Sequence, residues 1–321
     1  MSSVDPTLTG TGARQPWSAL PSQVTHWVER ELGSRVVDAV DQSGGFSPGP
    51  AARVRGDDGQ RAFVKAASRE VNHDSYEMHR REARLTAALP RSPFTPDLLA
   101  TYDEDPWVAL LYTDVDGHTP QIPWRANELS QAVDALARLH DSFTPSPVTA
   151  VEPVADLLDD DLNGWRTLSS GSLPAGIDEW SARHIERLAG LEAGWVDATA
   201  GETLLHTDVR ADNMLVTEHG IVFVDWAHAS RGAAWFDLAA WAPSVAMQGG
   251  PDPDTFVTQA LASRAAAPDS DQLTATVAAI AGYFTERAAT PPPPGLPTLR
   301  KFQAAQGEIT RAWLRRRTGW R

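Results

Sequence analysis

Residues 206–213 read His-Thr-Asp-Val-Arg-Ala-Asp-Asn, and they combine acidic, basic and amide side chains within eight positions. Asp208 supplies a carboxylate that can accept a proton, and Asn213 supplies a side-chain carbonyl that can bind a hard cation such as Mg²⁺. A proton-accepting carboxylate close to an oxygen ligand for Mg²⁺ is the combination that phosphoryl transfer requires. The alternative interpretation is a polar loop that only happens to precede a buried hairpin.

The residues after Asn213 predict a β-hairpin over 214–225. Met214–Val216 is an apolar strand, Glu218–Gly220 is a three-residue turn, and Ile221–Val224 is the returning strand, which ends at Asp225. Strands of equal length around such a turn would put Asn213 and Asp225 opposite each other, roughly 5 Å apart. Two oxygen ligands at that separation can share one cation.

A lysine and a glutamate upstream are expected to form an ion pair. Strand alternation puts Lys65 on the same face as Phe63 and Ala67, which is a buried position that requires a partner. Glu82 lies on the apolar stripe of the following helix and points inward. The alternative is a structural ion pair, or a Lys65 whose ammonium reaches solvent.

A glycine-rich turn at 43–49 precedes the Lys65 strand. Its backbone N–H groups can hold phosphate oxygens, and we assign this role to Gly45, with a contribution from the hydroxyl of Ser47. The turn lacks the G-x-G-x-x-G spacing of protein kinases, and an ordinary hairpin turn is the alternative.

Further from these motifs, the chain divides into a β-rich part and a helical part. We expect a flexible segment over 1–20, an N-terminal lobe over 21–112, a connector over 113–118 and a larger lobe over 119–321. The predicted elements are a helix from Ser22 to Gly33, strands over 35–40, 51–55, 60–67, 98–102 and 107–112, a helix opened by an Asp74–Glu77 capping box and ending near Leu89, and helices around 129–140, 178–196, 253–267, 270–288 and 298–317.

The 206–213 stretch, followed by Asp225-Trp226, resembles the catalytic loop and metal-binding aspartate of the aminoglycoside phosphotransferase family. This family resembles the choline kinases and, more distantly, the protein kinases. The resemblance extends from about residue 35 to at least residue 245. It implies an α+β, bilobal protein-kinase-like fold, with a small β-rich N-terminal lobe, a larger mostly α-helical C-terminal lobe and ATP between them.

The resemblance also implies roles for individual residues. Asp208 would act as the catalytic base, Asn213 and Asp225 would hold Mg²⁺, and Lys65, fixed by Glu82, would position the ATP phosphates. In the connector, backbone groups of Thr113 and Val115 would bind the adenine edge, although a plain interdomain connector is the alternative.

Three more residues lie in or near the catalytic loop, and the resemblance implies a role for Asp237. Asp237 would brace the loop through backbone N–H groups, and His206 is expected to be a packed scaffold residue and not a base. Arg210 either steadies the transferring phosphoryl group or is a surface arginine.

Composition limits the partners. The 321 residues carry 28 basic and 42 acidic side chains, a net charge of −14, which disfavours non-specific nucleic-acid binding. The sequence has no cysteine, no run of about 18 apolar residues and no secretory signal, so we expect a cytoplasmic protein that is not inserted in a membrane. Oligomeric state is left open.

The expected activity is ATP- and Mg²⁺-dependent phosphorylation of a small-molecule hydroxyl, and an aminoglycoside or another antibiotic is one class of acceptor. An acidic run (Asp156, Asp159, Asp160 and Asp161) either binds an amine-rich substrate or forms a solvated helix start. One rival hypothesis is a catalytically silent nucleotide-binding regulatory module. Another is a hydrolytic metal site at His206, Asp208 and His228, which leaves Lys65 and Glu82 unexplained.

Overall fold

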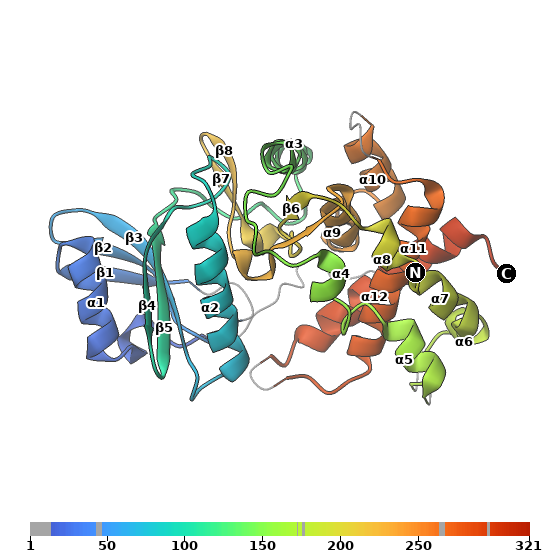
Figure 1. The fold of residues 1–321 in the computed structure, drawn as a ribbon, viewed down its shortest axis with the longest axis horizontal. Coiled ribbons are helices and arrows are strands. Elements are labelled where there is room, and N and C mark those ends of the chain that lie inside the picture. Colours follow the sequence, from blue (N-terminus) through green and yellow to red (C-terminus); the bar gives the residue numbers. More distant parts are fainter. Residues whose placement is uncertain (1–13, 43–46, 172, 175–176, 263–266, 294–295) are drawn as a thin grey trace.

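Five strands form one antiparallel sheet in the N-terminal part of the computed structural model (Figure 1). The structure describes residues 14–42, 47–171, 173–174, 177–262, 267–293 and 296–321. The sheet has the order β1-β2-β3-β5-β4, and its strands are β1 (Val36–Asp41), β2 (Ala51–Gly56), β3 (Arg61–Ser68), β4 (Leu98–Glu104) and β5 (Trp107–Thr113). The strands that the sequence predicts are therefore confirmed.

Each face of the sheet is covered by one helix. On β3, the side chains of Val64 and Ala66 pack toward α1 (Ser22–Leu32), while Ala67 packs toward α2 (His73–Ala88). This is the alternation expected of a strand that is buried on both faces. Figure 1 shows the sheet between the two helices, with α2 on the side of the helical lobe. Lys65 therefore leaves the sheet on the α2 side.

The ends of α1 and α2 test two predictions. Gly33 ends α1 in the left-handed conformation, with φ 72°, as its glycine predicts. The capping-box prediction for α2 is wrong, because Asn72 is the N-cap and its side chain accepts a 2.7 Å hydrogen bond from the Ser75 N–H. Asn72, two residues before Asp74, supplies the capping oxygen, so the helix begins before Asp74.

The first described residues make contacts with the N-terminal lobe. A 3-10 turn, η1 (Trp17–Ala19), lies inside the segment that we expected to be flexible, and Leu20 is buried. Arg14 donates a 3.2 Å hydrogen bond to the Gly49 carbonyl, and the Gln15 N–H donates a 2.9 Å bond to the Pro48 carbonyl.

The C-terminal lobe is mostly helical, as expected. Its helices are α3 (Ala126–Ser142), α4 (Val154–Leu157), α5 (Gly164–Ser170), α6 (Glu179–Arg183), α7 (Ile185–Glu192), α8 (Trp195–Ala198), α9 (Trp235–Met247), α10 (Pro253–Leu261), α11 (Ser270–Ala288) and α12 (Leu299–Thr318). The helical pattern expected over 178–196 is divided into three short helices. The pattern expected over 253–267 ends at Leu261, and residues 263–266 lie outside the described part.

Short strands and turns in this lobe position the residues of the 206–225 region. They are β6 (Thr203–Leu205), η2 (Ala211–Asn213), β7 (Met214–Thr217), β8 (Gly220–Phe223), η3 (Trp226–His228) and β9 (Ser230–Gly232). β6 pairs with β9, and β7 pairs with β8 in the predicted hairpin. Figure 1 shows these elements between α2 and the helices of the C-terminal lobe.

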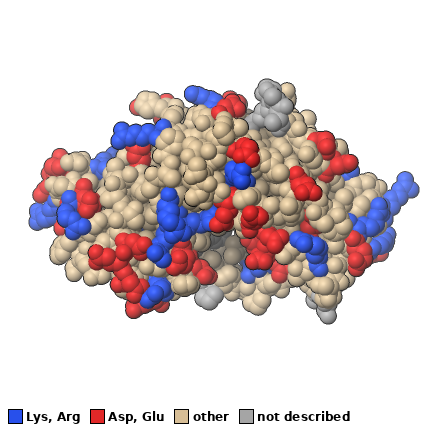
Figure 2. Space-filling model, in the orientation of Figure 1, with Lys and Arg blue, Asp and Glu red and all other residues tan. Residues whose placement is uncertain are grey.

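The surface carries mixed charge despite the net charge of −14. On the face drawn in Figure 2, acidic and basic side chains are interspersed over both lobes. Among the described residues, no helix combines the length and the apolar character that crossing a membrane requires.

Candidate active site

The loop that follows β6 is held by one buried carboxylate. In the first turn of α9, Asp237 accepts hydrogen bonds from the backbone N–H groups of His206 (2.9 Å) and Thr207 (2.8 Å). His140 on α3 places its Nε2 2.9 Å from the same carboxylate. Burial alone would raise the pKa of Asp237, but the bonds from His140 and from the backbone outweigh it and lower the pKa. The loop is therefore fixed to two helices at the residues just before Asp208.

His206 is packed inside the lobe. Its side chain is fully buried, its ring lies 4.7 Å from that of Trp226, and Nε2 is 2.9 Å from the Val224 carbonyl. Because a carbonyl only accepts, Nε2 carries the proton. Burial lowers the pKa of His206, which favours the neutral ring. The structure thus places His206 where it supports the loop and the β8 end of the hairpin.

Asp208 is held by two donors. Arg210 donates to its Oδ1 at 3.0 Å, and the Asn213 side-chain amide donates to its Oδ2 at 3.0 Å. Arg210 also donates two parallel hydrogen bonds, both 3.0 Å long, to the carboxylate of Asp212. Burial opposes the charge of Arg210, but Asp208 and Asp212 outweigh it and raise the pKa of the guanidinium. The alternative of a surface arginine is wrong, because only 17% of the Arg210 side chain is exposed.

Lys65 joins the two lobes. Its ammonium lies 2.6 Å from Oε2 of Glu82 and 3.0 Å from Oδ1 of Asp225, and only 11% of its side chain is exposed. Tyr112 donates a 3.0 Å bond to the other Glu82 oxygen. The expected Lys65–Glu82 ion pair is present, and Asp225 is a third member that the sequence did not reveal.

The charges in this group follow from the pairing. Burial alone would lower the pKa of Lys65, but Asp225 and Glu82 outweigh it and raise that pKa. Burial alone would raise the pKa of Asp225, but Lys65 holds it well below its usual range. Burial raises the pKa of Glu82, and Lys65 only partly opposes this rise. Lys65 and Asp225 are therefore charged near neutral pH.

Helix α2 also contacts the segment after Asp225. Arg81, the neighbour of Glu82, donates to the carbonyl groups of Ala227 (3.0 Å) and Ala229 (3.3 Å). One residue of α2 thus binds the C-terminal lobe while the next binds Lys65. The helix sets the distance between the lysine and the residues of the hairpin.

The predicted register of the hairpin is shifted by one residue. Gly220 belongs to β8 and pairs with Thr217, so the turn has two residues and not three. Asn213 consequently faces Val224, whose N–H donates a 2.9 Å bond to the Asn213 carbonyl. Asp225 comes one residue later, with φ 68°, in the left-handed region that few non-glycine residues adopt. Asn213 and Asp225 are still adjacent in the fold, but they are not a cross-strand pair.

The donor set of these two residues fits Mg²⁺. Asn213 uses its amide nitrogen for the bonds to Asp208, at 2.9 Å and 3.0 Å, so its Oδ1 is the atom that can face a cation. Asp225 contributes an ionised carboxylate. Mg²⁺ typically takes one or two protein oxygens and completes its shell with phosphate and water.

The glycine-rich turn is only partly described. Gly45 lies in 43–46, outside the described residues. The Ser47 hydroxyl accepts a 3.4 Å bond from the Gly49 N–H, and a Cβ on Gly49 would collide with the Ala66 carbonyl. Gly49 is therefore required for the close approach of this segment to β3. Arg14, which binds the Gly49 carbonyl, experiences the charges of Asp225 and Asp212, which oppose the lowering of its pKa by burial.

In the connector, half of the expected backbone groups are already bonded. The Thr113 N–H donates to the Asp97 carbonyl at 2.9 Å, and the Val115 carbonyl accepts from Arg53 at 2.8 Å. An adenine edge would therefore have to use the Thr113 carbonyl and the Val115 N–H.

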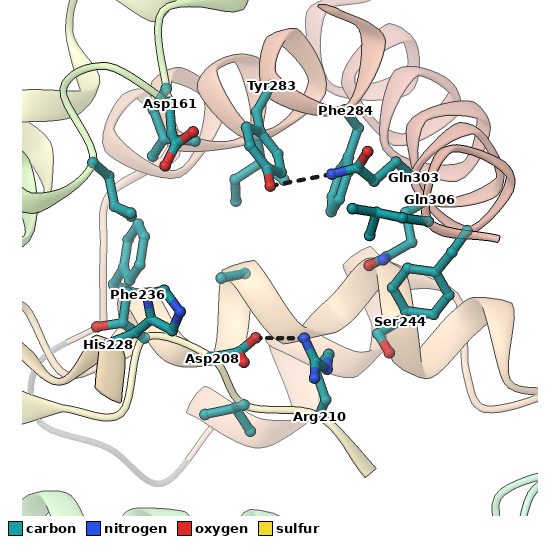
Figure 3. Close-up of a pocket in the computed structure, with 18 residues that line it drawn as sticks. Asp161, Asp208, Arg210, His228, Phe236, Ser244, Tyr283, Phe284, Gln303 and Gln306 are labelled. Carbon is teal, nitrogen blue, oxygen red and sulfur yellow. Dashed lines mark hydrogen bonds and ion pairs between the residues drawn. The ribbon is translucent and has the colours of Figure 1, made fainter. Parts of the chain in front are cut away.

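A cavity of about 320 Å³ adjoins the catalytic loop (Figure 3). Asp208 and Arg210 lie on one side of it, and Tyr283 of α11 and Gln303 of α12 lie on the opposite side. Asp161 also borders this space. The cavity is the place where a second molecule can meet Asp208.

Comparison with known proteins identifies the family. The model of the phosphotransferase enzyme family matches residues 43–273, which is more than half of the chain. The chain belongs to this family. It is a small-molecule phosphotransferase with the protein-kinase-like fold that the sequence predicts. No curated protein sequence matches the chain.

Solved structures of this fold include phosphotransferases with different acceptors. A spectinomycin phosphotransferase in complex with ADP and spectinomycin is 13% identical, with a TM-score of 0.57 and coverage of 92% of this chain and 94% of that chain. An aminoglycoside-3'-phosphotransferase of type VIII is 17% identical, with a TM-score of 0.50 and coverage of 81% and 98%. A choline/ethanolamine kinase family protein from Mesorhizobium loti is 17% identical, with a TM-score of 0.55 and coverage of 91% and 94%. At these identities the similarity shows the fold alone.

Several residues of this phosphotransferase site escape sequence reasoning. Tyr112, Tyr283, Gln303 and Gln306 belong to no motif, and Asp212 lies in the 206–213 stretch without a role assigned to it. Within the described chain, no group of three or more His, Cys, Asp or Glu side chains is arranged to hold a metal ion. The proposed hydrolytic site is not assembled, because His206 is buried against Val224.

Proposed function

We propose that this phosphotransferase transfers the γ-phosphoryl group of ATP, in the presence of Mg²⁺, to a hydroxyl group of a small molecule. One observation carries the proposal. Asp208 borders the cavity and is bonded to Asn213, while Asp225, two residues after the end of β8, is bonded to Lys65. The proton acceptor is thus bonded to one proposed cation ligand and the phosphate-binding lysine to the other, and the bond from the Val224 N–H to the Asn213 carbonyl brings the two ligands together.

Each residue has a separate task in this proposal. Asp208 accepts the proton of the acceptor hydroxyl, and its two donors, at 3.0 Å each, fix the direction in which its carboxylate faces. Lys65 binds phosphate oxygens. Glu82 keeps the Lys65 ammonium in place when the Asp225 carboxylate binds the cation. Arg210 stands beside Asp208 and adds positive charge where the phosphoryl group is transferred.

The Asn213 Oδ1 and the Asp225 carboxylate would hold the cation. Bound Mg²⁺ neutralises the charge of the phosphates and orients them. The Thr113 carbonyl and the Val115 N–H would bind the adenine edge, and the turn that contains Gly45 and Ser47 would cover the phosphates. Asp237 supports the loop without touching the substrate.

The acceptor is a hydroxylated small molecule, and an antibiotic such as an aminoglycoside is one class to test. Spectinomycin in one structural relative and a choline or ethanolamine assignment in another show that this fold serves chemically different acceptors. We expect acceptor choice to depend on the side chains of the helical lobe, because function resides in the site and not in the fold.

An ATP-consumption screen over hydroxylated antibiotics, sugars and amino alcohols tests the proposal. Turnover should fall by at least about 10³-fold in Asp208→Ala, while binding of the Mg²⁺–ATP complex survives. Asp141→Ala, at an exposed aspartate of α3, is the matched control and should behave like the wild type. Full activity in Asp208→Ala would refute the assignment. Nucleotide binding without ATP hydrolysis and without any phosphorylated product would favour the silent regulatory module.

A further inference from the structure

The cavity beside Asp208 has a composition that restricts the acceptor. We propose that the acceptor is an uncharged alcohol with an apolar ring or chain, and not a polycation such as an aminoglycoside. This inference rests on the proposed function, because it takes the cavity of Figure 3 as the acceptor site.

The carboxylates that border the cavity are already paired. Asp161 lies 2.7 Å from Arg287, and Asp208 lies 3.0 Å from Arg210. A polycation is recognised by carboxylates that lack a cation of their own, since a paired carboxylate has little charge left to offer. Both arginines are shared, Arg210 with Asp212 and Arg287 with Glu286 at 3.5 Å, but neither of the two carboxylates on the cavity wall lacks a cation of its own.

The remaining hydrogen-bonding groups on the far wall are neutral. Gln303 donates a 3.3 Å bond to the Tyr283 hydroxyl and accepts a 2.7 Å bond from Arg300. The Tyr283 hydroxyl thus accepts within the protein and retains its hydrogen for a ligand. Burial, with a further contribution from Asp161, raises the pKa of Tyr283 to about 12, so the phenol remains protonated.

Gln306 is the polar side chain that most needs a ligand. It is 4% exposed and borders the cavity, and Figure 3 shows it on the same wall as Gln303. Within the described residues, no hydrogen bond of its side-chain amide is present, whereas Gln303 has two. Buried amides are nearly always hydrogen-bonded in proteins, so a bound molecule with a hydroxyl or carbonyl group is the expected partner.

The rest of the lining is apolar. Three aromatic rings (Phe236, Phe284 and Phe302) and the aliphatic side chains of Leu158 and Ile280 border the space. A cavity of about 320 Å³ is at the small end of ligand sites, and its aromatic lining favours a compact apolar group. A hydrated polyamine would lose its water here and gain no unpaired carboxylate.

The test is an ATP-consumption screen with matched probes. Phenyl β-D-glucoside and other neutral aryl and alkyl glycosides form one half of the library. Their amino-substituted analogues, including the 2-amino-2-deoxy glucoside, form the other half together with kanamycin. We expect the productive acceptors to be neutral, with kcat/KM at least about tenfold higher than for the amine analogue. Turnover confined to amine-bearing compounds would overturn the inference, and so would the absence of turnover with every neutral compound.

A thermal-shift measurement with Mg²⁺–ATP distinguishes a failure of the acceptor inference from a failure of the proposed function. If the nucleotide binds but only amines are phosphorylated, the inference on the acceptor fails and the proposed function stands. If the nucleotide does not bind, the proposed function fails and the inference fails with it.

Two variants connect the specificity to this cavity. Gln306→Leu should raise the KM for the best neutral acceptor about tenfold, the loss expected for one hydrogen bond, while the KM for ATP is unchanged. Gln259→Leu, an exposed glutamine of α10, is the control and should leave both constants unchanged. Arg287→Gln leaves Asp161 unpaired and should improve kcat/KM for the amine analogues relative to the neutral ones. An unchanged preference in both Gln306→Leu and Arg287→Gln would contradict the assignment of the cavity.

Discussion

The side-chain amide nitrogen of Asn213 lies 3.0 Å from Oδ2 of Asp208. This contact gives Asn213 two tasks, because its nitrogen holds the proton acceptor while its oxygen can face a cation. The proposed reaction requires that Asp208, the base for the acceptor hydroxyl, is aligned with the metal. The positions of both therefore depend on the Asn213 side chain.

Asn213→Ala removes both functions at once. We expect kcat to fall by about 10²-fold, since Asp208 loses a bond that fixes its orientation, and the Mg²⁺ concentration for half-maximal rate to rise. Steady-state kinetics over a Mg²⁺ titration measures both effects. Asn127→Ala, at an exposed position of α3, is the control. A Mg²⁺ dependence equal to that of the wild type would remove Asn213 from the metal site.

The Lys65–Glu82 pair predicts a strong energetic coupling. Lys65→Met leaves Glu82 buried without its cation and should lower the free energy of unfolding by about 3–5 kcal/mol. Glu82→Leu should cost less, because Lys65 still has Asp225 at 3.0 Å. In the double variant, part of the loss should be recovered, by about 1–3 kcal/mol.

Urea denaturation of the four proteins in this double-mutant cycle measures the coupling. The exposed pair Arg183–Glu179 is the comparison, and its coupling should stay below about 1 kcal/mol. Additive effects of the Lys65 and Glu82 substitutions would contradict an interacting pair.

We predict that Asp237 contributes more to the free energy of unfolding than to the catalytic step. Asp237→Ala deprives two buried backbone N–H groups of their acceptor and should lower the free energy of unfolding by about 3 kcal/mol or more. The loss in kcat should follow the loss of folded protein. Asp141→Ala, an exposed aspartate on α3, serves as control in urea denaturation. A stable Asp237→Ala protein with a large loss of kcat would instead assign Asp237 a direct part in the reaction.

His79 on α2 predicts acid sensitivity of the fold. Burial, with a further contribution from Lys65, lowers the pKa of His79 to about 3, whereas an unfolded histidine titrates near its ordinary value. As the pH falls below about 6.5, the unfolded chain binds a proton that the folded chain does not bind, so acidification favours unfolding. Between pH 7 and pH 5 this group should remove about 2 kcal/mol from the free energy of unfolding.

The variant His79→Gln isolates that contribution. Its loss of unfolding free energy between pH 7 and pH 5, measured by urea denaturation, should be about 2 kcal/mol smaller than that of the wild type. His26→Gln, at an exposed histidine of α1, should show the wild-type loss. Equal losses in His79→Gln and the wild type would mean that His79 titrates in the folded protein as it does in the unfolded chain.

Local patterns were sufficient for most of the fold. The alternation of Ala62, Val64 and Ala66 with Phe63 and Lys65 is a property of the strand itself, because a buried two-sided strand needs apolar groups on both faces. The helix end at Gly33 and the helix around 129–140 are equally local predictions, and they are confirmed. The cap of α2 was predicted wrongly because both Asn72 and Asp74 can serve as caps, and the sequence does not say which one accepts the bond.

The amino-acid sequence by itself determined the catalytic loop, the hairpin, the family and the Lys65–Glu82 pair, because these depend on spacing within one segment or on two motifs that a known fold brings together. Only the tertiary structure decided the register that sets Asn213 opposite Val224, the pairing of Arg210 with Asp208 and Asp212, and the cavity between the catalytic loop and the last two helices. A two-residue and a three-residue turn are both common in hairpins, so the local sequence leaves the register open, whereas the partners of a charged or amide side chain are chosen by every element that packs around it.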